Sequence, residues 1–433
     1  MRKIIASAGL VALGATGLQA AYAPGLSTME TSKPWTVSAT LRGFYDDNYN
    51  TAPSGTNKLS SFGFEVRPSL GLNLSLGQTY VGLRYIYDMK YYVDRVDNKY
   101  DQSHQFDAVL SHTISERYSI DLSDSFVIAQ EPELLAPSSG GFSSFVRTDG
   151  NNIRNQASAA FTAQLTTVLS LVLGYDNTLI DYEQTEADVI ASGGTGASRS
   201  ALLDRMEHLA RINLRWQVLP ETLGILGYQF GIVDYTSTES LDPVGDPTGA
   251  LVPSSIRDSR SHYVYLGADH SFRPDLKASL RVGGQFVQYV NNSAADNAIS
   301  PYADANLTYT YMTGSFLQLG LKHARNATDV GVSPGSTNVT LDQESTSVYA
   351  QLNHRITPSL TGNLLAQFQN STFNGGVDDG KSDNFYLVGL NLSYRFNPFL
   401  SAEAGYNYDR LESDVSGRNY VRNRVYVGIT ASY

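Results

Sequence analysis

The 433-residue chain contains no cysteine, and only 17% of its residues are charged, against about 25% in a typical soluble domain. The missing cysteine excludes disulfide scaffolds, zinc ribbons and thiol catalysis. With 42 acidic and 31 basic residues the net charge is −11, which leaves no overall basic surface, so we expect no nucleic-acid partner. Beyond the N-terminal stretch, no apolar run approaches the ~18 residues that a membrane helix needs. A membrane role would therefore have to use strands.

The N-terminus has the features of a secretory signal peptide. Arg2 and Lys3 precede an apolar stretch from Ile4 to Leu18, and small residues follow it. The stretch is shorter than a membrane span, which favours a cleaved signal over a membrane anchor. We predict a signal peptide at 1–21, cut between residues 20 and 23, and a periplasmic segment at 22–35.

From Thr36 onward, apolar and polar residues alternate with a period of two, which is typical of strands with two chemically different faces. In 206–218, for example, Ile212 and Leu214 lie on one face and Arg211 and Arg215 on the other. The pattern predicts about eighteen strands, at 36–46, 60–76, 79–93, 104–113, 117–129, 154–165, 168–182, 203–218, 223–235, 260–270, 276–290, 300–311, 315–323, 345–355, 360–373, 384–396, 400–410 and 419–433.

Short and long connections alternate between these segments, as in the periplasmic turns and extracellular loops of outer-membrane barrels. The sequence repeats weakly at the short turns, which would also suit a propeller, but strands of about a dozen residues are too long for a blade. A membrane sheet has to close on itself, because unpaired backbone is costly in lipid. We therefore predict an all-β fold, a transmembrane antiparallel up-and-down β-barrel spanning 36–433 in the cell outer membrane.

The phase of the alternation predicts which face each side chain occupies. The apolar face has to meet lipid and the polar face the lumen, because charge on the lipid side is costly. We predict that the lumen is lined by arginines from strands all around the barrel: Arg42, Arg67, Arg84, Arg211, Arg215, Arg281, Arg395, Arg422 and Arg424.

One residue breaks this rule. Asp124 shares the outward phase of Tyr118, Ile120 and Leu122 in the segment 117–129. A β-bulge near Ser123 would turn the carboxylate back toward the lumen, and we expect one there.

Two interpretations of the inward charges remain open. A mostly basic lumen, with the acids gathered in the long loops, would favour anions. Alternatively, the arginines form internal salt bridges, for example Arg42 or Arg67 with Glu65 or Glu403.

The sequence supports no catalytic, cofactor or metal site. Asp269, His270 and Ser271 are consecutive in a strand, so His270 faces away from both neighbours and a catalytic triad cannot form locally. The glycine-rich stretch 192–196 lacks the strand and helix of a phosphate-binding loop, and 378–383 lacks the ligand spacing of a calcium loop. Both are predicted to be flexible extracellular loops.

Several stretches resemble the β-barrel porin 2 type of outer-membrane β-barrel family: Ala-Gln-Glu-Pro-Glu-Leu-Leu at 129–135, Ile-Arg-Asn at 153–155, Leu-Gly-Tyr at 173–175, and the closing stretches 394–406 and 419–425. The resemblance covers most of 36–433. It implies an outer-membrane barrel, and some members are linked to exopolysaccharide export. It defines no functional residues that could be assigned to this chain.

We therefore expect a water-filled channel for small hydrophilic solutes, anionic ones among them, rather than an enzyme. The alternatives are an exopolysaccharide export conduit and a structural or adhesive barrel plugged by its loops. Expected partners are outer-membrane lipid and lipopolysaccharide, the barrel assembly machinery, which would read Tyr433 as a C-terminal signal, and, for the conduit, a periplasmic polysaccharide export protein.

Overall fold

The computed structural model describes residues 34–53, 58–96, 98–130, 150–194, 196–242, 251–332 and 338–433. The signal peptide predicted at 1–21, and residues 22–33 of the predicted periplasmic segment, lie outside these ranges. So do residues 131–135 of the first stretch that resembles the porin family.

Eighteen antiparallel strands form one sheet. They are β1 (Trp35–Asp46), β2 (Ser61–Leu76), β3 (Thr79–Tyr92), β4 (Tyr100–Ser115), β5 (Tyr118–Ala129), β6 (Asn152–Gln164), β7 (Leu169–Tyr182), β8 (Arg205–Leu219), β9 (Thr222–Tyr235), β10 (Ser259–Arg273), β11 (Leu276–Tyr289), β12 (Ala298–Met312), β13 (Ser315–Asn326), β14 (Asp342–Arg355), β15 (Leu360–Asn374), β16 (Ser382–Asn397), β17 (Leu400–Ser413) and β18 (Tyr420–Ser432). Each strand pairs with the next along the chain, and β1 also pairs with β18, so the sheet is closed. The predicted barrel is confirmed, and each of the eighteen predicted segments falls on one strand.

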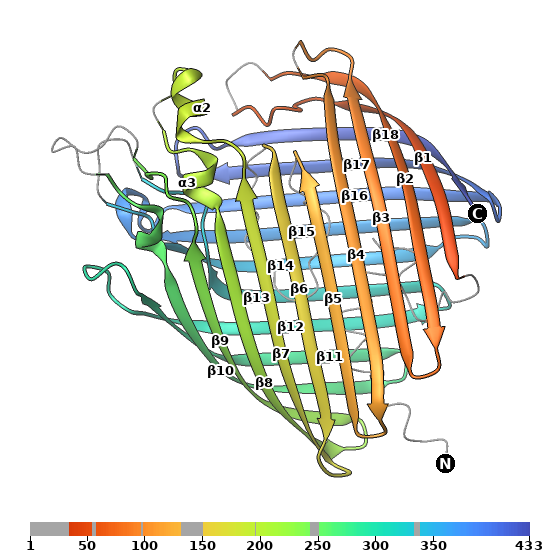
Figure 1. Ribbon diagram of the computed structural model, residues 1–433. Coiled ribbons are helices and arrows are strands. Elements are labelled where there is room, and N and C mark those ends of the chain that lie inside the picture. The colour runs from red at the N-terminus through yellow and green to blue at the C-terminus, as the bar shows by residue number, and fades with distance from the viewer. Residues whose placement is uncertain are drawn as a thin grey trace.

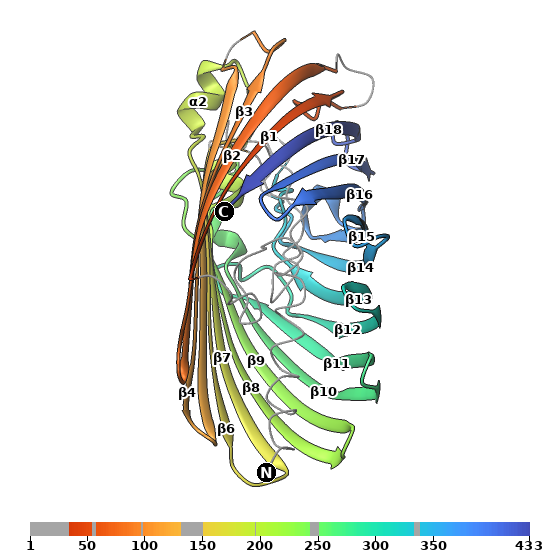
Figure 2. The same cartoon turned by 90° about the vertical axis from the view of Figure 1, so that its right-hand side faces the viewer.

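Figure 1 shows the near wall, β3 to β9, crossing in front of the far wall, β10 to β18. Such crossing is expected when the strands of a closed barrel tilt relative to its axis. Figure 2 shows the two walls facing each other across the interior. No helix in the described part of the chain is long and apolar enough to cross a membrane.

Helical turns lie in the long loops. They are α2 (Glu186–Ala191), α3 (Arg199–Leu203), η1 (Ser254–Arg257) and η2 (Gly376–Asp378). The sequence analysis predicted a flexible loop at 192–196 and did not predict the helical turns α2 and α3 on either side of it. Thr185 and Asp188 form a capping box at the start of α2, and the Ser198 side chain caps α3. These capping residues are the sequence signal that period-two analysis overlooks.

The outer face of the barrel is apolar along the middle of the strands. On β10, Val264 and Leu266 are 59% and 64% exposed, and on β11 Leu280 and Val282 point outward in the same way. Their neighbours Tyr265 and Gln285 face inward and are buried. The phase predicted from alternation is therefore the phase of the structure on this wall.

Histidines lie on the outer face at two levels. Near the extracellular ends, His104, His208 and His262 each hydrogen-bond through Nδ1 to the hydroxyl of an outward tyrosine on the preceding strand (2.7–2.9 Å), and His323 pairs with Thr346 (2.8 Å). Near the periplasmic turns, His112 and His270 pair with threonine hydroxyls (both 2.8 Å), and His354 pairs with Tyr311 (2.7 Å). We call these the extracellular and periplasmic histidine rings. Amphipathic rings with a polar tip suit membrane interfaces.

The two rings bracket an apolar band of membrane dimensions. His104 and His112 are eight residues apart on β4, and His262 and His270 have the same separation on β10. At about 3.4 Å per residue and a tilt of about 40°, eight residues rise roughly 21 Å along the barrel axis. This is close to the ~25 Å apolar band of outer-membrane barrels. The rings therefore mark the two edges of the hydrocarbon layer.

The bulge expected near Ser123 is absent. The pairing of β5 with β4 and with β6 runs without a register shift through this residue; the one shift between β4 and β5 is at the turn, between Thr113 and Ser115. Asp124 therefore keeps its outward phase, where its Oδ1 accepts a hydrogen bond from Asn155 (3.0 Å). The expectation was wrong because it assumed that the structure would avoid an outward carboxylate.

We predict that Leu266→Arg impairs barrel stability far more than Ser279→Arg does. Leu266 lies midway between His262 and His270 on the outer face, so an arginine there costs about 2–4 kcal/mol in lipid. Ser279 faces the lumen opposite Asp269, where an added arginine meets a carboxylate. Reversible unfolding in lipid vesicles measures both changes, and equal losses would contradict the assigned faces.

Candidate functional site

The inner wall carries ion pairs between strands that are adjacent or one strand apart. Arg42 on β1 contacts Glu65 on β2 (2.8 Å) and Glu403 on β17 (2.6 Å). Arg84 on β3 contacts Asp107 on β4 (2.6 Å). The interpretation of the lumen as a set of internal salt bridges, with Arg42 bound to Glu65 or Glu403, agrees with these contacts.

A second set of inward charges lies on β7 to β12. Arg211 on β8 contacts Asp176 on β7 (2.9 Å), and Arg281 on β11 contacts Asp269 on β10 (2.7 Å). Arg281 also lies directly opposite Asp304 of β12 in the strand register. Sequence reasoning placed the acids mainly in the loops and missed Asp176, Asp269 and Asp304. The same alternation would have placed all three aspartates on the inner face, because the residues on both sides of each aspartate are outward-facing.

Arg215 differs from these paired arginines. Its Nε is buried and has no hydrogen-bond partner within the described ranges. The guanidinium is close enough to Asp269, Arg211 and Arg281 for their charges to interact. These three arginines and Lys322 of β13, which lies opposite Asp304, therefore form a basic cluster that the three carboxylates Asp176, Asp269 and Asp304 only partly neutralise.

The remaining predicted arginines lie at the ends of the barrel or outside these networks. Arg422 on β18 is 1% exposed and is ion-paired with Asp46 of β1 at the extracellular end. Arg424 lies opposite the same Asp46 in the register of β1 and β18. Arg395 is exposed at a periplasmic turn, where it donates to the carbonyl of Pro358 (3.4 Å). Arg67 is half-buried on the inner face of β2.

Loops from strands that are not neighbours pack together at the extracellular mouth. Ala201 of α3, Leu241 and Val252 of the β9–β10 loop, and Val339 of the β13–β14 loop form one buried apolar cluster. Arg257 of η1 is fully buried beside it and donates to the carbonyls of Ala201 (3.1 Å) and Leu202 (2.8 Å). We call this the loop cluster.

A second contact extends the loop cluster around the mouth. Arg418, between β17 and β18, is ion-paired with Asp329 of the β13–β14 loop (3.0 Å) and with Asp383 of β16 (2.9 Å). Loops from β7 to β18 are thus joined by described contacts. The extracellular entrance is consequently shaped by packed loops as well as by the strand ends.

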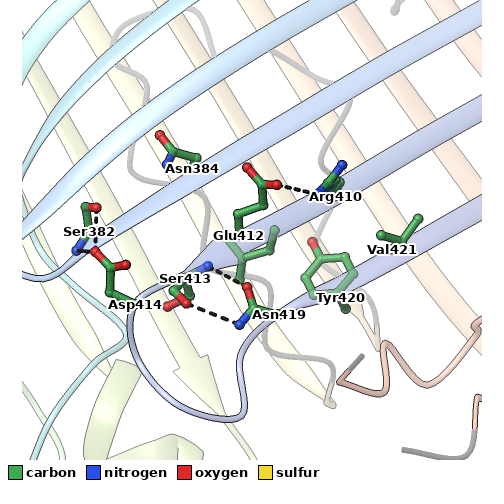
Figure 3. Close-up of a pocket in the computed structure, with 10 residues that line it drawn as sticks. Ser382, Asn384, Arg410, Glu412, Ser413, Asp414, Asn419, Tyr420 and Val421 are labelled. Carbon is green, nitrogen blue, oxygen red and sulfur yellow. Dashed lines mark hydrogen bonds and ion pairs between the residues drawn. The ribbon is translucent and has the colours of Figure 1, made fainter. Parts of the chain in front are cut away.

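A small pocket lies at the extracellular ends of β16, β17 and β18 (Figure 3). Its polar groups are largely paired with one another: Arg410 with Glu412, and Ser382 with Asp414 (2.8 Å). These hydrogen bonds from Ser382 lower the pKa of the Asp414 carboxyl. Because its charges are already paired, the pocket offers little to an incoming solute.

Tyr433 lies at the seam of the barrel. Its backbone N–H donates to Val37 of β1 (2.8 Å), and its ring lies against Trp35, with the centroids 5.2 Å apart. The ring itself is largely exposed on the periplasmic end of the outer face. Its role as an assembly signal stays a prediction.

Asp269 and His270 occupy opposite faces of β10. The Asp269 carboxylate contacts Arg281 in the lumen, whereas the His270 imidazole bonds to Thr222 on the outside. Within the described part of the chain, no three His, Asp or Glu side chains are grouped closely enough to hold a metal ion.

Comparisons with known proteins give one family and several structures. Residues 343–433 match the family described as "Putative beta-barrel porin 2". No curated protein matches the chain. Among solved structures, the outer membrane protein opdK from Pseudomonas aeruginosa is 12% identical with a TM-score of 0.43, covering 92% of this chain and 99% of that one. A BenF-like porin from Pseudomonas fluorescens Pf-5 is 11% identical with a TM-score of 0.45, covering 93% and 99%. Residues 343–433, which form nearly all of β14 to β18, therefore match the β-barrel porin 2 family that the sequence motifs resemble.

Proposed function

We propose that this protein is an outer-membrane channel through which small hydrophilic solutes diffuse. The observation that carries the proposal is the closed ring of eighteen strands with a polar, charged inner face. Barrels of this size are too wide for side chains alone to fill, so they enclose an aqueous channel. The family description as a porin supports passage of solutes and does not favour the export conduit.

The basic cluster gives this channel a preference for anions. Most inward arginines are matched by a carboxylate of a neighbouring strand, so their fields largely cancel over a few ångströms. Arg211, Arg215, Arg281 and Lys322 outnumber the three carboxylates Asp176, Asp269 and Asp304 by one, which leaves excess positive charge on the inner face of β8 to β13. In a low-dielectric wall this charge concentrates anions, and salt screens it with a Debye length near 10 Å at about 0.1 M.

We predict modest anion selectivity that decreases as salt rises and that Arg215→Gln shifts toward equal permeability. Arg260→Gln is the matched control, because Arg260 is exposed in the outward phase of β10 and its loss removes the same charge outside the lumen. The reversal potential across a planar bilayer in a dilute KCl gradient measures both. The absence of conductance in the folded protein would overturn the channel, and cation selectivity in the unaltered protein would overturn the anion preference alone.

The loop cluster makes the entrance sensitive to pH through Asp204, which follows α3. This carboxylate accepts hydrogen bonds from the Tyr182 amide (2.7 Å) and the Ser200 hydroxyl. Burial, together with the nearby charges of Asp181 and Glu239, raises the pKa of Asp204 to about 6. Because the folded pKa lies above the unfolded value, protonation stabilises the folded loop. This stabilisation is complete below about pH 4 and is lost as the pH rises through about 6.

We predict that amides of 182–204 are better protected from hydrogen exchange at pH 4.5 than at pH 7.5, after correction for the intrinsic exchange rate. Asp204→Asn keeps a neutral side chain of the same shape at both pH values, so its protection should not change between them. Persistence of the same pH dependence in Asp204→Asn would show that another group is responsible.

A further inference from the structure

Asp124 lies on the outer face near the middle of the hydrocarbon band. It is directly opposite Ala108 in the register of β5 and β4, and Ala108 is midway between His104 and His112 of the two histidine rings. No other outward position between the rings on β3 to β14 carries an aspartate, glutamate, lysine or arginine, and the outward Arg410 of β17 is ion-paired with Glu412 toward the extracellular end of its strand. An ionisable side chain at this depth is costly in lipid and normally has a partner.

Within the barrel the carboxylate has one partner. Asn155 donates to Oδ1 (3.0 Å), and no second donor from the described residues reaches this side chain. A carboxylate can accept about four hydrogen bonds, and hydrocarbon supplies none. The carboxylate therefore has free acceptor capacity directed away from the barrel.

The surface around Asp124 is unusually small and polar for a lipid-facing wall. Ala108, Ala157 and Ala159 surround it on the outer faces of β4 and β6. Asn177 on β7 and His208 on β8 continue the polar surface, with Asn177 Nδ2 lying 3.2 Å from His208 Nδ1. We call these residues, with Asp124 and Asn155, the outer patch. By contrast, Val264, Leu266, Leu280 and Val282 form a continuous large apolar surface on β10 and β11.

The outer patch is suited to close contact between two membrane walls. Small residues let backbones approach, and polar side chains bond across the contact. The patch contains an acceptor, Asp124, together with the amide donor Asn155, whose Nδ2 has a second N–H beyond the one that Asp124 accepts. In a two-fold interface the same patch meets itself, so each carboxylate can face the second N–H of the amide of the partner's Asn155.

We propose that a second copy of this chain packs against the outer face of β4 to β7 and covers Asp124. The occupant is identified by self-complementarity, since a lipid tail offers no donor to the carboxylate. The inference concerns the assembly of the barrel and does not depend on what passes through its lumen.

Cross-linking tests the contact directly, because the chain has no cysteine of its own. Ala108→Cys, Ala157→Cys and Ala159→Cys place single thiols on the outer patch, and Leu280→Cys places one on the apolar wall as the matched control. After oxidation in native membranes, we expect at least one patch variant to form a disulfide-linked product of twice the chain's mass, and Leu280→Cys to remain monomeric. Cross-linking no stronger in any patch variant than in Leu280→Cys, or a product containing a different protein, would overturn the proposal.

A substitution at Asp124 separates a subunit contact from a lipid contact. If the patch joins two copies, Asp124→Leu removes a bond between them and lowers the oligomer fraction measured by light scattering in mild detergent, while the barrel still changes its gel mobility on heating. If the patch faces lipid, Asp124→Leu removes a lipid-exposed carboxylate, so the mass stays that of a monomer and the unfolding temperature rises. Leu280→Ala is the control on the apolar wall and should leave the mass unchanged.

Discussion

Closure of the backbone hydrogen-bond network is the constraint on which the rest of this structure depends. In hydrocarbon an unpaired N–H or C=O group has no water to bind, so a sheet can cross the membrane only if its first and last strands meet. Here β1 pairs with β18 over nine residues, from Ser38 opposite Ser432 to Asp46 opposite Arg424. Two ion pairs reinforce this seam. Arg42 in the middle of β1 binds Glu403 of β17, and Asp46 at the extracellular end of β1 binds Arg422 of β18.

Closure also explains how much the sequence could reveal. Once the barrel is closed, each side chain has only two environments, lipid or lumen, and period two assigns it to one of them. Ile212 and Arg215 were placed correctly by alternation alone. The helical turns α2 and α3 were missed because loops outside the membrane are free of this constraint and follow local capping by Thr185 and Ser198 instead.

Partners across strands were harder to predict than faces. Arg422 and Asp46 are 376 positions apart in sequence and become neighbours only because the barrel closes. Arg211 meets Asp176, rather than another carboxylate of the lumen, because of the register of β7 and β8. Alternation tells which face a side chain occupies but not which residue lies beside it on the next strand. Alternation alone therefore could not show that carboxylates neutralise most of the inward arginines. In the fully buried pair of Arg422 and Asp46, loss of one partner would cost about 3–5 kcal/mol.

Asp176 and Asp124 show how the two environments treat the same residue type. Asp176 faces the lumen, where Arg211 and the hydroxyl of Ser158 (2.8 Å) bind its carboxylate. Asp124, two strands away, faces outward with only Asn155 as a donor. On the described strands β3 to β14 every other outward position between the histidine rings is uncharged, so this carboxylate stands out. A residue that departs from the apolar pattern of the lipid face usually has a functional reason to do so. For Asp124 the reason that we propose is a hydrogen-bond donor that comes from outside the barrel.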